Sequence, residues 1–179
     1  GLDPTQRHRY AQLDGDAVFL ARADLYSALD RPFFDLRDRR LLSNLGDGLM
    51  RVEYERLPVA TDESTPLDEN IQRQTVAIHE SYEKNAADEW RMIRPVEAQA
   101  WAARLDLLER ALQTTLGAKY VDAPENLADY GLRTPFSTLT AYGKDGTKQT
   151  VHFGWPTGDA EFPGLYVKRA DQDFVAVID

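Results

Sequence analysis

Short segments in which apolar and polar residues alternate dominate the chain. From Leu49 to Leu57, Val52 and Tyr54 are separated by charged residues, which is the period of a strand with one buried face. Gln74 to Tyr82 and Glu89 to Arg94 have the same character. These segments predict an antiparallel sheet.

Polar turn sequences join further pairs of predicted strands, and an Asp-Gly turn tolerates the positive φ that a tight hairpin requires. The predicted hairpins are Arg9–Leu13 with Ala17–Arg22, Phe136–Tyr142 with Thr147–Phe153, and Leu165–Lys168 with Phe174–Ile178. Before the second of these hairpins, Tyr130-Gly131 predicts the end of a short helix, because glycine adopts the left-handed conformation without strain.

One longer segment has the period of an amphipathic helix, which we predict from Val96 to Leu116. Its apolar residues recur at intervals of three and four, and this spacing places them on one stripe that must be buried. The stripe consists of Ala98, Trp101, Leu105, Leu108 and Leu112, and the wetter side carries Arg104, Asp106, Glu109 and Arg110. The sequence therefore predicts an α+β fold, in which antiparallel hairpins pack against one long helix.

The two ends of the chain resemble each other. Tyr10–Ala23 aligns with Tyr166–Asp179 without a gap, each as a strand, a polar turn and an apolar strand. We interpret residues 1–48 as the tail of a preceding repeat and residues 49–179 as the main repeat unit. Residues 58–70 are rich in Pro, Asp, Glu, Ser and Thr, and this composition predicts a mobile acidic loop.

Composition narrows the class of protein. The 179 residues are 42% hydrophobic, which is enough to bury a core. The 21 basic and 30 acidic residues give a net charge of −9, which argues against a nucleic-acid partner. Cysteine is absent, so disulfides, thiolate nucleophiles and cysteine-type zinc sites are excluded. We also expect no membrane span or signal peptide within the chain, and membrane contact only through a segment outside it.

A series of short motifs resembles the bacterial domain of unknown function 4340. The motifs are Leu36–Leu42, Trp90, the helix that follows Pro95, Tyr130–Pro135, the strand pair that ends at Gly154, and Tyr166–Arg169. The resemblance covers nearly the whole chain, with Pro58–Asn70 as an insertion. It implies an extracytoplasmic domain, periplasmic or at the cell surface, that is membrane-tethered in the full-length protein and repeated in tandem. It also implies an accessory role beside ABC-type transport or gliding-motility components, and it supplies no catalytic residues.

No residue pattern indicates catalysis. His79 and His152 lie in predicted strands without a second ligand at metal-binding spacing, and the acidic residues of the 58–70 loop fit no calcium loop. Nucleophile-elbow, phosphate-loop and zinc-peptidase motifs are missing from the sequence. We therefore expect no metal, no cofactor and no catalytic residue.

Two places are candidates for binding. Arg37 and Arg39 could hold an anion or a partner, although their alternation with acidic residues favours a structural latch supported by Leu36, Leu41 and Leu42. Trp155 and Phe162 could form an aromatic platform in the loop at 154–164, or Trp155 could close a hairpin over the core.

The leading interpretation is a non-enzymatic interaction module with a protein partner in a bacterial envelope complex. The alternative is a small-ligand or glycan-binding domain that uses the loop at 154–164. A hydrolase of unusual type is a third reading. An exposed apolar patch or strand edge would favour the first, a concave pocket the second, and a buried cluster of perturbed titratable groups the third.

Overall fold

The computed structural model describes residues 7–12, 17–30, 36–43, 45, 48–58, 77–158 and 163–179. The chain divides into two compact units, Gly1–Asp38 and Arg39–Asp179. This division falls before the boundary expected after residue 48, because Leu41, Leu42 and Leu45 are buried in the core of the second unit. Whether the first unit is the tail of a repeat stays a prediction.

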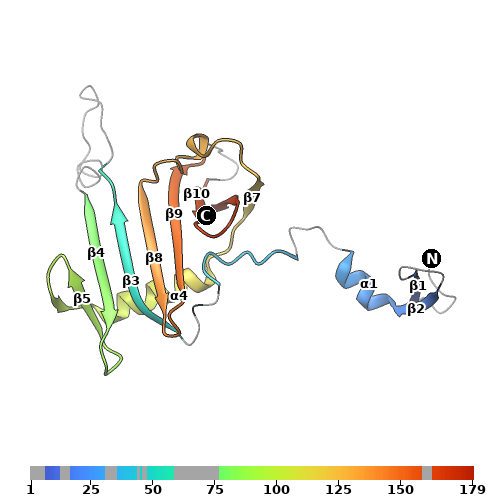
Figure 1. The fold of residues 1–179 in the computed structure, drawn as a ribbon, viewed down its shortest axis with the longest axis horizontal. Helices are drawn as coiled ribbons and strands as arrows, with labels where there is room; N and C mark the ends of the chain where they lie inside the picture. The colour runs from blue at the N-terminus through green and yellow to red at the C-terminus, as the bar shows by residue number, and fades with distance from the viewer. Residues whose placement is uncertain are drawn as a thin grey trace. The chain divides into compact units, whose positions relative to one another are not determined.

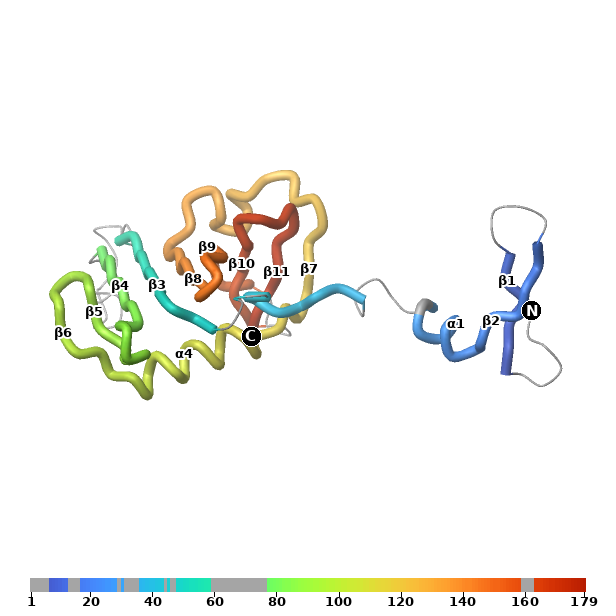
Figure 2. Tube along the Cα trace, turned by 60° about the horizontal axis from the view of Figure 1, so that its bottom comes forward, coloured from blue at the N-terminus to red at the C-terminus, as the bar shows by residue number. Residues whose placement is uncertain are grey.

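The first unit contains the expected hairpin and a short helix (Figure 2). Strands β1 (His8–Gln12) and β2 (Val18–Arg22) pair antiparallel, and α1 (Ala23–Leu29) follows at once. The Arg9 guanidinium lies 3.6 Å from the centre of the Tyr26 ring, which joins the hairpin to the helix. Apolar side chains at Val18, Phe19 and Leu20 are exposed on β2.

The second unit is built on one sheet, which has nine strands among the described residues. Its strand order is β6-β5-β4-β3-β8-β9-β10-β11-β7, and every pair is antiparallel. The strands are β3 (Leu49–Arg56), β4 (Ile78–Lys84), β5 (Trp90–Arg94), β6 (Ala98–Gln99), β7 (Lys119–Asp122), β8 (Ser137–Gly143), β9 (Lys148–Pro156), β10 (Leu165–Arg169) and β11 (Phe174–Ile178). Figure 1 shows the long central strands β4, β3, β8 and β9 side by side.

Most of the predicted strands and turns are confirmed. The register of β8 with β9 places the Lys144–Gly146 turn at its tip, where Gly146 has φ 83°. The 3₁₀ helix η1 (Leu127–Tyr130) ends at Gly131, with φ 67°. Gln74–Val76 and nearly all of the 58–70 loop lie outside the described residues.

The predicted long helix is wrong at both ends. Helix α4 runs from Ala102 to Thr114, and Ala98–Gln99 forms β6 instead, paired with β5. The backbone of this segment hydrogen-bonds to a neighbouring strand, and this pairing overrides its helical period. Trp101 precedes the helix in extended conformation and is 68% exposed, so it does not belong to the buried stripe. The described part of the fold is thus mainly β, and the expected α+β class with one long helix is not confirmed.

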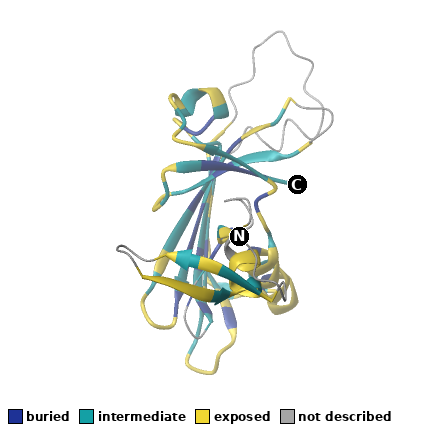
Figure 3. Cartoon of the chain, turned by 90° about the vertical axis from the view of Figure 1, so that its right-hand side faces the viewer, coloured by how far each residue is buried: buried dark blue, intermediate teal, exposed yellow. Residues whose placement is uncertain are grey.

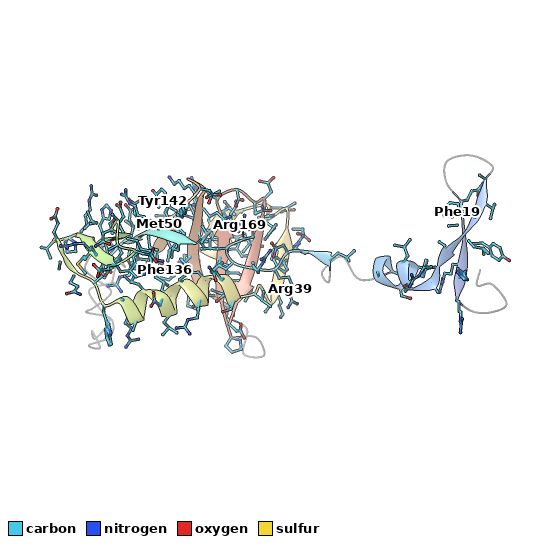
Figure 4. All side chains as sticks on the ribbon, turned by 90° about the horizontal axis from the view of Figure 1, so that it is seen from below. Phe19, Arg39, Met50, Phe136, Tyr142 and Arg169 are labelled. Atoms are coloured by element: carbon cyan, nitrogen blue, oxygen red, sulfur yellow. The ribbon has the colours of Figure 1, made fainter. Side chains whose placement is uncertain are left out.

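Helix α4 covers one face of the sheet. Leu105 and Leu112 point into a core formed with alternate residues of the central strands, namely Val52, Leu139, Ala141, Val151, Val167 and Ala176. The other positions of these strands face away from the helix, as period-two geometry requires, and Figure 3 shows buried and exposed residues alternating along the sheet. Seen from below in Figure 4, the helix crosses the strands.

Candidate ligand-binding cavity

A cavity of about 580 Å³ lies between helix α4 and the sheet. This volume falls within the range of about 300–1,000 Å³ that is typical of small-molecule sites. Its lining is mostly apolar and aromatic: Leu41, Val52, Tyr54, Glu80, Tyr82, Arg104, Leu105, Leu108, Ala111, Leu112, Thr115, Phe136, Ser137, Leu139, Phe153, Leu165 and Ile178.

The helix supplies one wall of the cavity. Its lining residues are three, four or seven positions apart, and they therefore form one stripe along the cylinder. They run from Arg104 at the start of α4 to Thr115 just after its end. The stripe predicted from sequence is confirmed at Leu105, Leu108 and Leu112, and these side chains both pack the core and face the cavity.

Six strands supply the opposite wall. The register explains why their lining residues meet, since Val52 lies opposite Tyr82 and Tyr54 lies between Glu80 and Leu139. Along β9, β10 and β11 the wall continues with Phe153, Leu165 and Ile178. The cavity therefore crosses the strands from β4 towards β11 beneath the helix.

One polar pair interrupts this apolar lining. The Tyr82 hydroxyl donates to Glu80 Oε2 at 3.0 Å, and both residues lie on the cavity face of β4. Burial and the Glu80 carboxylate together raise the pKa of Tyr82 to about 12, so the phenol stays protonated as a donor. Sequence reasoning did not single out this pair. The signal was present as a carboxylate and a tyrosine two residues apart on one strand.

The segment 39–43 closes the end of the cavity nearest β7. Leu41 lines the cavity, and its N–H donates to the Thr115 carbonyl at 2.9 Å. The Arg39 carbonyl accepts from Gly117 N–H at 2.8 Å. Leu41 and Leu42 are buried as the latch interpretation requires, whereas Leu36 is 55% exposed and takes no part in that burial.

Side chains from β9 and β10 hold the latch at Ser43. Gln149 Oε1 accepts from Ser43 N–H at 3.1 Å, and its amide nitrogen donates to the Ser43 carbonyl. Arg169 donates to Ser43 Oγ at 2.8 Å and pairs with Asp171 at 2.6 Å. Arg169, whose position Figure 4 marks, is thus a structural residue of the latch.

The predicted binding residues are not gathered into one site. Arg37 belongs to the first unit and Arg39 to the second, and neither lines the cavity. Trp155 does not line it either, and its ring lies against Gly131, where an added Cβ would approach Cδ1 to 2.5 Å. Trp155 is 58% exposed and covers the η1 turn, while Phe162 lies outside the described residues.

Both strand histidines lie on the face of the sheet away from α4. His79 Nε2 is 3.6 Å from Glu55 Oε1 and 3.4 Å from an Arg94 nitrogen. His152 Nδ1 lies 3.2 Å from the Thr138 hydroxyl, and burial together with Lys168 lowers the pKa of His152. Among the described residues, no three His, Asp or Glu side chains gather as a metal site.

The helices of the described segments are too short or too polar to cross a bilayer. The chain matches no protein-family model, no curated protein and no solved structure. The cavity and its lining are therefore the basis for assigning a function.

Proposed function

We propose that residues 39–179 form a module that binds a small, largely apolar ligand in the cavity beneath α4. The observation that carries this proposal is the 580 Å³ volume with an apolar and aromatic lining. Water gains few hydrogen bonds in such a space, and an apolar ligand is stabilised when its surface leaves water. The ligand-binding role expected for the loop at 154–164 thus moves to the opposite side of β9.

The module acts by binding and release and not by bond-making. Its lining offers one hydrogen-bonded pair, Glu80 with Tyr82, and the raised pKa of Tyr82 keeps that phenol in its neutral form. The other lining residues supply shape and apolar surface. We therefore expect saturable binding without turnover.

A fluorescent apolar probe tests the proposal. N-phenyl-1-naphthylamine should bind the full chain with a stoichiometry of one and gain fluorescence. Leu108→Trp should abolish this signal, because Leu108 lines the cavity. The matched control is Leu107→Trp on the same helix, where Leu107 is 53% exposed, and this variant should bind the probe normally.

Two results would contradict the proposal. The first is a probe signal equally reduced by both tryptophan variants, and the second is no saturable binding by the unchanged protein. Circular dichroism and thermal unfolding of both variants establish that the fold is retained in the comparison.

A second candidate function is the interaction module of a bacterial envelope transport or gliding-motility-like complex. It is supported by the motif order that resembles domain of unknown function 4340 and by the apolar side chains exposed on β2. Val18 is 62% exposed and Leu20 is 52% exposed, and such clustered surface is typical of a contact with another protein. In this proposal the domain is extracytoplasmic and membrane-tethered through a segment outside the chain.

Cross-linking in envelope extracts tests the second candidate. The protein should recover a transporter component, and the double change Val18→Ser with Leu20→Ser should prevent the recovery. Asp106→Ser, on the exposed side of α4, is the control. Equal recovery by all three proteins would count against the β2 surface.

A further inference from the structure

The charged residues of the cavity lie at one end. Glu80 on β4 and Arg104 at the start of α4 are the charged side chains among the described lining residues. The opposite end is formed by Leu165, Ile178 and Thr115. A cavity with one charged end and one apolar end matches a ligand with the same asymmetry.

The cavity is also elongated. From Arg104 to Thr115 the helix rises about 16 Å at 1.5 Å per residue. On the sheet side, the lining passes from β4 through β3, β8, β9 and β10 to β11, which is about 24 Å at the usual strand spacing. An extended hydrocarbon chain advances about 1.25 Å per carbon, given single bonds of about 1.5 Å at tetrahedral angles. A chain of about 12–14 carbons therefore spans the helix wall.

The two charged residues differ in what they can offer a ligand. Arg104 is exposed, and its guanidinium lies 4.9 Å from the centre of the Trp101 ring. Glu80 is half-buried, and it accepts one bond from Tyr82. An ionised carboxylate has about four acceptor positions, and within the described residues no Lys or Arg forms a salt bridge with Glu80. The unused acceptors therefore favour a donor or a cation.

We infer that the cavity takes a single-chain amphiphile whose cationic head, such as an alkylammonium group, binds Glu80 and whose hydrocarbon tail runs beneath α4 towards Ile178. This inference rests on the proposed function, because it assigns the ligand class of the same cavity. Tyr82 fixes the orientation of the Glu80 carboxylate through its hydrogen bond. The net charge of −9 further concentrates cations near the protein.

Competition against N-phenyl-1-naphthylamine tests the inference with three probes of equal chain length. Dodecylamine, dodecanol and dodecanoate are compared below their micelle concentrations at neutral pH. Dodecylamine should bind most tightly. Glu80→Gln should weaken dodecylamine by about ten-fold or more, because the variant loses the charge but keeps the shape. The affinity for dodecanol should stay unchanged, which shows that the cavity is still folded.

Glu83→Gln is the matched control. Glu83 is an exposed residue on the same strand, at a position of opposite parity to Glu80, so its loss should leave all three affinities unchanged. A series of amines from eight to sixteen carbons should gain affinity up to about 12–14 carbons and then level off, as the length of the helix wall predicts.

Three outcomes separate the inference from the proposed function. Tightest binding of dodecanoate, weakened by Arg104→Gln, would overturn the cationic head and place an anionic head at Arg104. Equal binding of all probes with no effect of Glu80→Gln would overturn any head recognition. In both cases the naphthylamine signal remains, and the apolar cavity stands. Loss of that signal in the unchanged protein would overturn both proposals.

Discussion

Glu109 on helix α4 accepts a hydrogen bond from the backbone N–H of Leu49, with Oε1 3.1 Å from the nitrogen. Its other oxygen lies 3.7 Å from Lys84 Nζ. Both side chains are mostly buried, with 18% of Glu109 and 14% of Lys84 exposed. One carboxylate therefore connects the helix to the start of β3 and to the end of β4.

Glu109→Ala should destabilise the protein by about 1–3 kcal/mol, because it leaves a buried N–H and a buried ammonium group without their acceptor. The helical period alone places Glu109 on the wetter side, where alanine would be nearly neutral. Urea unfolding measures the difference. Asp106→Ala on the exposed side of α4 is the control and should change stability by less than about 0.5 kcal/mol. Equal effects of the two changes would contradict the assigned role.

Alanine at three glycines should give a graded loss of stability. A Cβ at Gly154 would lie 2.0 Å from the Tyr130 carbonyl oxygen, a clash with backbone that cannot move aside easily. We expect Gly154→Ala to cost about 3 kcal/mol. Gly131→Ala should cost at least about 1–2 kcal/mol, because φ is 67° and the Trp155 ring must also shift.

Gly158 is the control in this series, since a Cβ there meets open space. Gly158→Ala should be neutral or slightly stabilising, because alanine reduces the entropy of the unfolded chain. Thermal unfolding gives the order of the three variants. A cost at Gly158 as large as that at Gly154 would contradict the packing of η1 against β9.

Gln149→Ala should loosen the latch at residues 39–43. The Gln149 amide both accepts from the Ser43 N–H and donates to its carbonyl, so its loss leaves two backbone groups unsatisfied. We expect a loss of about 1–3 kcal/mol in unfolding free energy. Amide hydrogen exchange should also rise at Leu41, whose N–H bonds to Thr115. Gln113→Ala, on the exposed side of α4, should leave both measurements unchanged.

The His152 imidazole should titrate below the ordinary value of 6.5, because burial and the nearby Lys168 disfavour its protonated form. The unfolded chain then takes up a proton at higher pH than the folded chain. This contribution to stability is present above pH 6.5 and is lost as the pH falls from 6.5 through the folded pKa. NMR titration of the ring measures the shift. Lys168→Met should bring the pKa part of the way back, and a His152 pKa above 6.5 would contradict the assigned environment.

The local signals in the sequence were sufficient for the hairpins. Alternation over Leu49–Leu57, the turn at Asp145-Gly146 and the stop at Tyr130-Gly131 all depend on neighbours within a few residues, and the structure confirms each of them. A period-two pattern specifies a strand because one face is buried, and a glycine with positive φ specifies a turn because other residues are strained there.

Tertiary structure decided what local pattern could not. Ala98 and Gln99 lie within a helical period but form β6, because β5 offers a hydrogen-bonding edge. The cavity required six strands and α4 to be placed together, so Glu80 and Tyr82 became a site through cross-strand register and not through a motif. Amphipathic period shows which side of an element is buried, but only the packed fold shows how completely that side is filled, and the space left unfilled beneath α4 is the candidate site.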